Sequence, residues 1–144
     1  MFLGEYQHAL DDKGRVVLPS KFRNSLAGGC VVAKGQDKCL YVYTMEAWAD
    51  KAAKVAALPG TDRKSRDFSR ALFGGAKDQE PDKQGRIAIP EPLLTYASLE
   101  GDVTVVGVAD HIEIWSTPAW QAISEVADEF YSGIEEALSA DGEI

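Results

Sequence analysis

The sequence predicts an α+β fold made of two copies of one small unit. The first observation is a nine-residue pattern that occurs twice, as DDKGRVVLP at residues 11–19 and as DKQGRIAIP at residues 82–90. The second is that segments typical of strands and of helices follow one another in the same order in both halves. The third is size, because a lone unit of about 70 residues has a marginal core and should pack against its copy.

The repeat extends well beyond this pattern. Upstream, Phe2 and Gly4 match Phe73 and Gly75 at the same offset of 71 residues. Downstream the offset grows by one residue, as a single insertion in a loop would produce. The matched pairs there are Val31 with Val103, Gly35 with Gly107, Leu40 with Ile112, Val42 with Ile114, Tyr43 with Trp115 and Trp48 with Trp120.

We expect two units, residues 1–72 and 73–144, that share one core and each follow the order ββαββα. In the first unit, strands are expected at 4–10, 16–18, 30–33 and 40–43, and helices at 20–26 and 45–58. Short apolar runs between glycines indicate the strands. Phe22 and Leu26, four residues apart, indicate the first helix, and Thr44 is suited to cap the second.

Two more helices flank the second unit. A basic connecting helix is expected at residues 61–72, with Arg63, Lys64, Arg66 and Arg70 along it. Thr117 followed by Pro118 is typical of an N-cap and a first helical position. Apolar residues at three- and four-residue steps then predict an amphipathic helix of about 20 residues. They are Trp120, Ile123, Ala127, Phe130, Ile134 and Leu138.

Charge is distributed unevenly along the chain. The 144 residues are 45% hydrophobic and 26% charged, as in an ordinary globular domain, and the net charge is −8. Residues 1–75 carry a net charge of +4 and residues 76–144 carry −12. Salt screens the acidic end beyond about 8 Å, so the basic half can still attract phosphate locally. The acidic end itself is read as a solubilising segment.

Several function classes find no support in the residues. No apolar run is long enough for a membrane span, and no signal pattern opens the chain, so a cytoplasmic protein is expected. The two histidines, His8 and His111, lie in no metal or nucleophile motif, and no phosphate-binding glycine loop occurs. We therefore expect neither an enzyme nor a cofactor.

The two cysteines are expected to be buried and reduced. If residues 35–38 form a hairpin turn, Cys39 faces Lys34 and Cys30 faces Tyr43. In that register the two thiols would not meet.

The repeated pattern itself combines a turn with an unexplained arginine. Asp at its first position and Gly at its fourth are the preferred residues of a tight turn that ends with positive φ. Turn chemistry requires nothing at Arg15 or Arg86, and strand propensity does not favour arginine. Each arginine can pair with the nearby aspartate, reach a phosphate or a guanine edge, or do both. Lys13, Lys21 and Arg23 would give the first loop the stronger electrostatic attraction.

Together the opening residues Met1 to Gly4 and the paired Asp-x-x-Gly-Arg patterns resemble the MraZ family of bacterial transcriptional regulators. The resemblance covers about residues 1–140. It implies two tandem AbrB-like swapped-hairpin units and a DNA-contacting role for both loops. The residues carried over are Asp11, Asp12, Lys13, Gly14, Arg15, Asp82, Lys83, Gln84, Gly85 and Arg86.

The resemblance also implies partners and a target. The expected partner is double-stranded promoter DNA, bound at direct repeats upstream of the division and cell-wall gene cluster and including the protein's own promoter. Binding there as a ring-like homo-oligomer, an octamer or larger, would repress transcription and place the protein on the nucleoid. The alternative is an antitoxin-like or ring-forming interaction module without DNA specificity.

Overall fold

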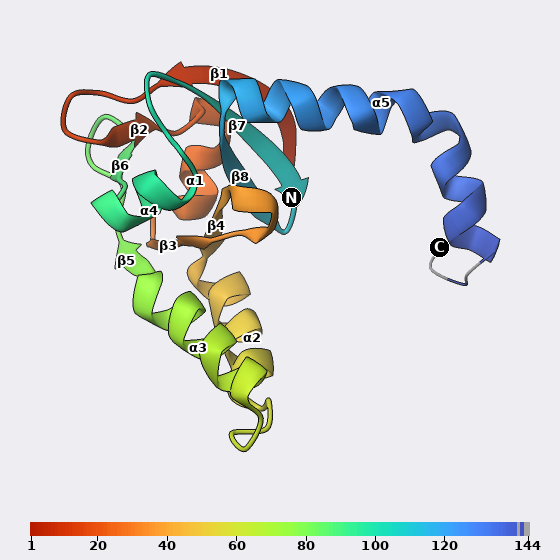
Figure 1. The fold of residues 1–144 in the computed structure, drawn as a ribbon. Coiled ribbons are helices and arrows are strands. Elements are labelled where there is room, and N and C mark those ends of the chain that lie inside the picture. Colours follow the sequence, from red (N-terminus) through yellow and green to blue (C-terminus); the bar gives the residue numbers. More distant parts are fainter. Residues whose placement is uncertain (141, 143–144) are drawn as a thin grey trace.

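The computed structural model describes residues 1–140 and residue 142, which form strands and helices in alternation (Figure 1). The strands are β1 (Phe2–Ala9), β2 (Arg15–Val17), β3 (Cys30–Lys34), β4 (Leu40–Thr44), β5 (Lys77–Gln79), β6 (Arg86–Ala88), β7 (Asp102–Ala109) and β8 (His111–Ser116). The α-helices are α1 (Arg23–Leu26), α2 (Met45–Ala56), α3 (Arg63–Gly75), α4 (Glu91–Tyr96) and α5 (Thr117–Ala140). The predicted α+β class is confirmed.

The strands of the two halves interleave. Six of them form an antiparallel sheet in the order β1-β7-β8-β4-β3-β5, and β2 and β6 form a separate two-stranded ribbon. Within these sheets β1 pairs with β7, β5 with β3, β4 with β8 and β2 with β6. Every strand of one half thus has a partner in the other, and either half alone would expose unpaired strand edges.

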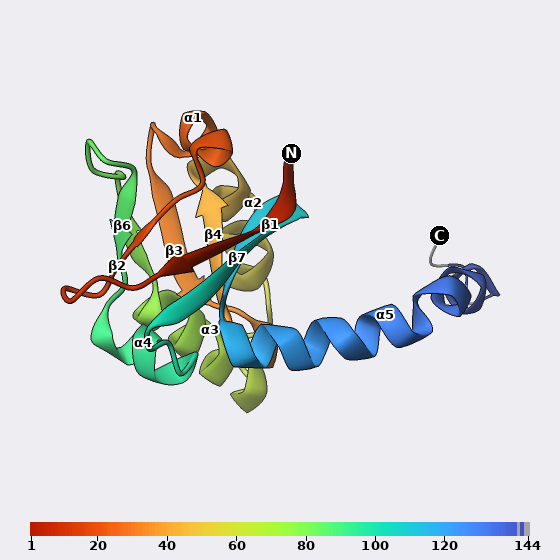
Figure 2. The same cartoon turned by 90° about the horizontal axis from the view of Figure 1, so that it is seen from above.

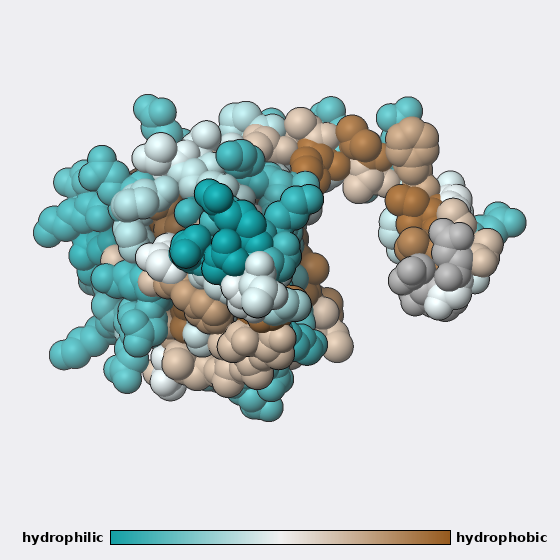
Figure 3. Space-filling view, turned by 60° about the horizontal axis from the view of Figure 1, so that its bottom comes forward, coloured by the Kyte–Doolittle hydropathy of each residue, from teal (hydrophilic) through white to brown (hydrophobic). Residues whose placement is uncertain are grey.

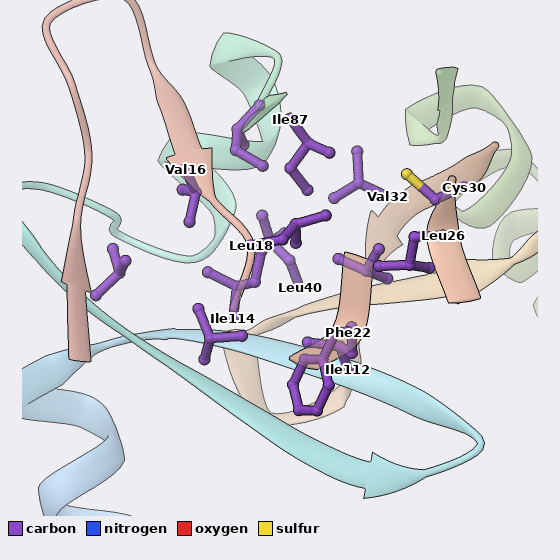
Figure 4. Close-up of a cluster of buried hydrophobic side chains, with 14 of the residues drawn as sticks. Val16, Leu18, Phe22, Leu26, Cys30, Val32, Leu40, Ile87, Ile112 and Ile114 are labelled. Atoms are coloured by element: carbon purple, nitrogen blue, oxygen red, sulfur yellow. The ribbon is translucent and has the colours of Figure 1, made fainter. Parts of the chain in front are cut away.

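The main core lies between the large sheet and the ribbon. Val16 and Ile87, which face each other in the ribbon, are fully buried against residues of both halves such as Val32, Leu40 and Ile114 (Figure 4). Burial of these aliphatic side chains removes apolar surface from water and fixes the ribbon to the sheet. The ribbon therefore presents one face to the core and the other to solvent.

The α2–α3 hairpin covers the opposite face of β3 and β4. Ala33 and Tyr43 alternate along their strands with core residues and pack there with Val55 and Leu72. The predicted cap of α2 is confirmed, because the Thr44 hydroxyl oxygen accepts from the Ala47 amide at 3.0 Å. The short helical segment at 20–26 is also confirmed, as a 3₁₀ turn followed by α1.

One register prediction was wrong. Lys34 pairs with Leu40 and Cys30 with Thr44, one position away from the expected facing pairs. The loop holds five residues instead of four, and the Gly35 amide closes it by donating to the Cys39 carbonyl at 2.8 Å. Two consecutive residues in the left-handed region, Asp37 and Lys38, accommodate the extra residue. Both cysteines are buried and free, as predicted.

The start of the second half also differs from the repeat. Phe73 and Gly75, which match Phe2 and Gly4 of β1 in sequence, lie in the last turn of α3. The helix runs past the expected end because the Phe73 ring packs on Trp48 of α2, with ring centroids 5.8 Å apart. As a result β5 has only three residues, whereas β1 has eight.

The long C-terminal helix is present, with a different cap. Ser116, not Thr117, accepts from the Ala119 amide, at 3.3 Å, while the Thr117 hydroxyl lies 3.0 Å from that of Thr104. Only the start of α5 packs on the body, through Ala119 and Trp120 against a cluster with Trp115. The rest extends away from it (Figures 1 and 2).

Two acids of the predicted tail, Asp141 and Glu143, lie outside the described residues. Within residues 1–140 and 142, no helix combines the length and the apolar character that crossing a membrane requires.

We predict that Gly107→Ala strongly destabilises the fold. Gly107 faces Gly4 in the β1–β7 ladder, and a Cβ there would overlap the backbone of β1, lying 2.8 Å from the Leu3 Cα. Backbone cannot move aside as a side chain can, so we expect a loss of about 3 kcal/mol, the upper end of the usual cost of overpacking, in the free energy of unfolding. Gly28→Ala is the matched control, since nothing lies within 4 Å of its added Cβ. Chemical denaturation giving equal stabilities for the two variants would contradict the prediction.

Candidate nucleic-acid interface

The loop before β2 is held by one carboxylate. Oδ1 of Asp11 accepts from the backbone amides of Lys13 at 2.9 Å and Arg15 at 2.8 Å, and Oδ2 accepts from the Arg15 Nε at 2.6 Å. The Asp11 amide in turn donates to the Arg15 carbonyl. Gly14 has φ of 72°, a conformation that a side chain disfavours. The predicted turn roles of Asp and Gly are confirmed.

The loop before β6 repeats this arrangement bond for bond. Asp82 accepts from the amides of Gln84 and Arg86, each at 2.9 Å, and from the Arg86 Nε at 2.7 Å. Gly85 has φ of 75°. Two segments far apart in the sequence thus form the same turn. In each, the aspartate holds both the turn and the Nε of the arginine.

Both carboxylates are ionised at neutral pH. Burial raises the pKa of Asp11, but hydrogen bonds from Arg15 and Lys13 and the Arg15 charge outweigh it, so the pKa lies below its ordinary value. For Asp82 the Arg86 backbone hydrogen bond is the largest influence, and the pKa is again lowered. The ion pairs therefore persist through the physiological pH range.

The ribbon places the two arginines on one face. Arg15 is opposite Ala88 and Arg86 is opposite Val17, while the central pair, Val16 and Ile87, points into the core. Since side chains alternate along a strand, Arg15 and Arg86 share the outer face as diagonal neighbours about 7–8 Å apart. Figure 2 shows the loops before β2 and β6 at opposite ends of this ribbon.

Each guanidinium keeps its outer groups available. The side chains of Arg15 and Arg86 are 27% exposed, and Nε carries the contact to aspartate. In the described part of the chain, no hydrogen bond joins the Nη groups of either arginine to the protein. Two fixed guanidinium groups with free Nη donors can take up phosphate or a guanine edge.

The other predicted loop residues are accessible. Asp12, Lys13, Lys83 and Gln84 are exposed on the turns, so their side chains are free to contact a partner. Gly85 is buried, while Gly14 is only half-buried. The two loops thus differ in what covers them.

Arg23 covers the second loop, not the first as the sequence suggested. A Cβ on Gly85 would lie 2.8 Å from the Arg23 Cζ, whereas a Cβ on Gly14 would contact Leu94 at 3.3 Å. The reason is the antiparallel pairing of β2 with β6, which brings the end of one strand, and the helix after it, to the loop that precedes the other. The expectation that Arg23 strengthens the first loop was wrong.

The sequence analysis also missed the role of Gln79 in holding the ribbon. Gln79 pairs through its side-chain amide with both backbone groups of Ala88, with its Nε2 donating at 2.9 Å and its Oε1 accepting at 2.8 Å. The side chain takes the place of a neighbouring strand and holds the end of β6. A glutamine at a strand end carries no signal of such a bond.

Comparison with known proteins gives one consistent result. The sequence model of a family described as "MraZ protein, putative antitoxin-like" matches residues 1–71 and again residues 72–139. A protein of Acetivibrio thermocellus named transcriptional regulator MraZ is 48% identical over 124 residues, which cover 86% of this chain and 87% of that protein.

Two further relatives carry the same name. The protein of Halothermothrix orenii is 44% identical over 138 residues, which cover 96% of each chain. That of Salinispora tropica is also 44% identical over 138 residues, covering 96% of this chain and 97% of the relative. With both halves matched by the family's model and nearly the whole length matched by these relatives, the chain belongs to the MraZ family.

Proposed function

We propose that the chain is a transcriptional regulator that binds double-stranded DNA through the outer face of the β2–β6 ribbon. The observation that carries the proposal is the pair of aspartate-fixed arginines, Arg15 and Arg86, on that face. The relatives' name supports regulation of transcription. The residues that would contact DNA are those of the two loops, 11–15 and 82–86.

The shape of the ribbon suits the major groove of B-DNA. That groove is about 12 Å wide and admits a two-stranded ribbon, and an arginine can donate two hydrogen bonds to one guanine. Because Asp11 and Asp82 hold each Nε, the Nη groups face outward with little freedom left to lose on binding. Lys13 and Lys83, one on each turn, are placed for phosphate.

The family resemblance supports a finer proposal for the target. We propose direct repeats upstream of the division and cell-wall gene cluster, including the protein's own promoter, with repression by occlusion. The protein would then work in the cytoplasm on the nucleoid. We also propose that the fold is of the AbrB-like swapped-hairpin type, which the exchange of β1 and β5 between the halves supports.

We further propose that the protein acts as a ring-like homo-oligomer of eight or more subunits. The α5 helix supports this, because none of its side chains is buried and its apolar stripe is open to solvent (Figure 3). Phe130 is 57% exposed and Ile134 is 44% exposed. Acids flank the stripe, whereas α3 bears Arg63, Lys64, Arg66 and Arg70, so α5 of one copy is complementary in charge to α3 of another.

Assembly would give the affinity that one ribbon lacks. A ribbon covers only a few base pairs, and repeating it around a ring against repeated DNA sites raises the overall affinity by about 10²–10⁴. An antitoxin-like module without DNA specificity remains the alternative. The two are separated by whether DNA from upstream of the gene shifts in a gel at moderate salt.

We predict that Arg15→Ala and Arg86→Ala each weaken binding to that upstream DNA while costing at most about 1 kcal/mol of stability, the usual value of a solvent-exposed ion pair. Lys54→Ala is the matched control, since it removes an exposed cation on α2, away from both the ribbon and the basic face of α3. Binding is measured by fluorescence anisotropy and subunit number by light scattering. Wild-type affinity in both ribbon variants would mean that the loops act only as hairpin turns and do not bind DNA.

The affinity should also depend steeply on salt. If the loops contact phosphates, the logarithm of the affinity falls against the logarithm of salt concentration with a slope of about 0.9 per contact. Titrations between low and physiological salt measure that slope. A flat response would mean that the two loops do not contact phosphates.

The oligomer can be tested on α5 itself. Light scattering of the wild type at micromolar concentration should give a multiple of the 15.6 kDa chain mass. The double variant Phe130→Asp and Ile134→Asp should shift the mass toward the monomer, because it charges the exposed apolar stripe. Ser132→Asp, which adds a charge on the opposite face of the helix, should not. A monomeric wild type would remove the avidity mechanism.

A further inference from the structure

The ribbon has a local twofold symmetry that its surroundings break. Rotation about the central pair, Val16 and Ile87, exchanges Arg15 with Arg86 and one aspartate turn with the other. At the repeat offset of 71 residues, however, Arg23 corresponds to Leu94. These two side chains cover the two loop glycines, so one end of the ribbon receives a cation and the other an aliphatic side chain.

Arg23 is fixed in place by backbone. Its Nε donates to the Leu18 carbonyl at 3.1 Å, and the Leu18 amide donates to the Gly85 carbonyl at 2.8 Å. The guanidinium therefore lies against the second turn, at Gly85. The half-buried Arg23 forms no ion pair within residues 1–140 and 142.

Packing does not require a charge at this position. The other half of the chain fills the equivalent place over Gly14 with Leu94, which packs against the main core. The charge of Arg23, which has no carboxylate partner among the described residues, also affects the neighbouring His8. Burial and then the Arg23 charge lower the pKa of His8, so this histidine stays neutral at physiological pH. The hydrogen bond to the Leu18 carbonyl uses the Nε of Arg23, and neither this bond nor packing accounts for the positive charge.

We propose that Arg23 is a third DNA-contacting arginine, which binds a backbone phosphate beside the base step reached by Arg86 and sets the direction of the ribbon on the duplex. The proposal rests on the proposed function. A symmetric ribbon would fit a site equally well in both directions and would suit inverted repeats. With Arg23 at one end only, a single direction brings three guanidinium groups to the DNA, and direct repeats can then be read alike by successive subunits.

Affinity and salt dependence give the first test, with Arg23→Leu as the variant. Leucine is the residue that the other half uses, so the variant should fold, and thermal melting checks this. We expect roughly five- to tenfold weaker binding to the upstream DNA and a salt slope lower by about one. Lys21→Leu is the matched control, because it removes a neighbouring exposed cation. An equal loss in both variants, or no loss in Arg23→Leu, would overturn the proposal.

Direction gives the second test. Glu80→Cys, at an exposed position just before the second loop and outside the proposed contacts, carries a tethered iron chelate that cleaves DNA nearby. It should cut on one side of a single site in the wild-type background. Adding Arg23→Leu should give cuts on both sides, and the exchange Arg23→Leu with Leu94→Arg should move them to the opposite side. One-sided cutting that Arg23→Leu leaves unchanged would overturn the proposal.

The role of Arg23 and the role of the ribbon can be disproved separately. If Arg15→Ala and Arg86→Ala weaken binding and Arg23→Leu does not, this inference alone is wrong. If the wild type does not bind the duplex, the proposed function is wrong and the inference falls with it.

Discussion

In each of two turns, one aspartate forms the same set of hydrogen bonds, and the surface that we propose for DNA depends on these bonds. In each turn one carboxylate accepts two backbone amides and one arginine Nε, so Asp11 and Asp82 set the loop shape and the guanidinium direction together. Charge-assisted hydrogen bonds of this kind are shorter and stronger than neutral ones. Without them, Arg15 and Arg86 would be long flexible side chains that lose more conformational entropy on binding.

The turns are useful because the two halves exchange strands. Each half supplies one strand of the ribbon, and Val16 and Ile87 tie both strands to a core built from both halves. The same antiparallel pairing brings Arg23 to the second loop and Leu94 to the first. The internal repeat therefore accounts for the symmetry of the ribbon, and the difference between Arg23 and Leu94 breaks that symmetry.

The sequence predicted what depends on local chemistry. Asp and Gly at fixed offsets identified both turns, and apolar spacing identified Phe22 and Leu26 as buried. The sequence predictions failed where contacts between residues far apart in the chain determine the structure. The place of Arg23 follows from strand pairing, and the extension of α3 through Phe73 follows from its packing on Trp48. The β3–β4 register depended on one residue more in a loop, a difference that turn propensities do not resolve.

We propose that the ribbon, and not the basic α3 helix, faces the DNA. The most direct measurement is photo-crosslinking from a benzophenone amino acid placed at Lys83 on the second loop or at Lys64 on α3, two exposed positions. Each protein is irradiated with upstream duplex, and the crosslinked DNA is quantified. If DNA binds the ribbon, position 83 gives crosslinks and position 64 gives none. Crosslinks from position 64 alone would mean that α3 faces the DNA instead.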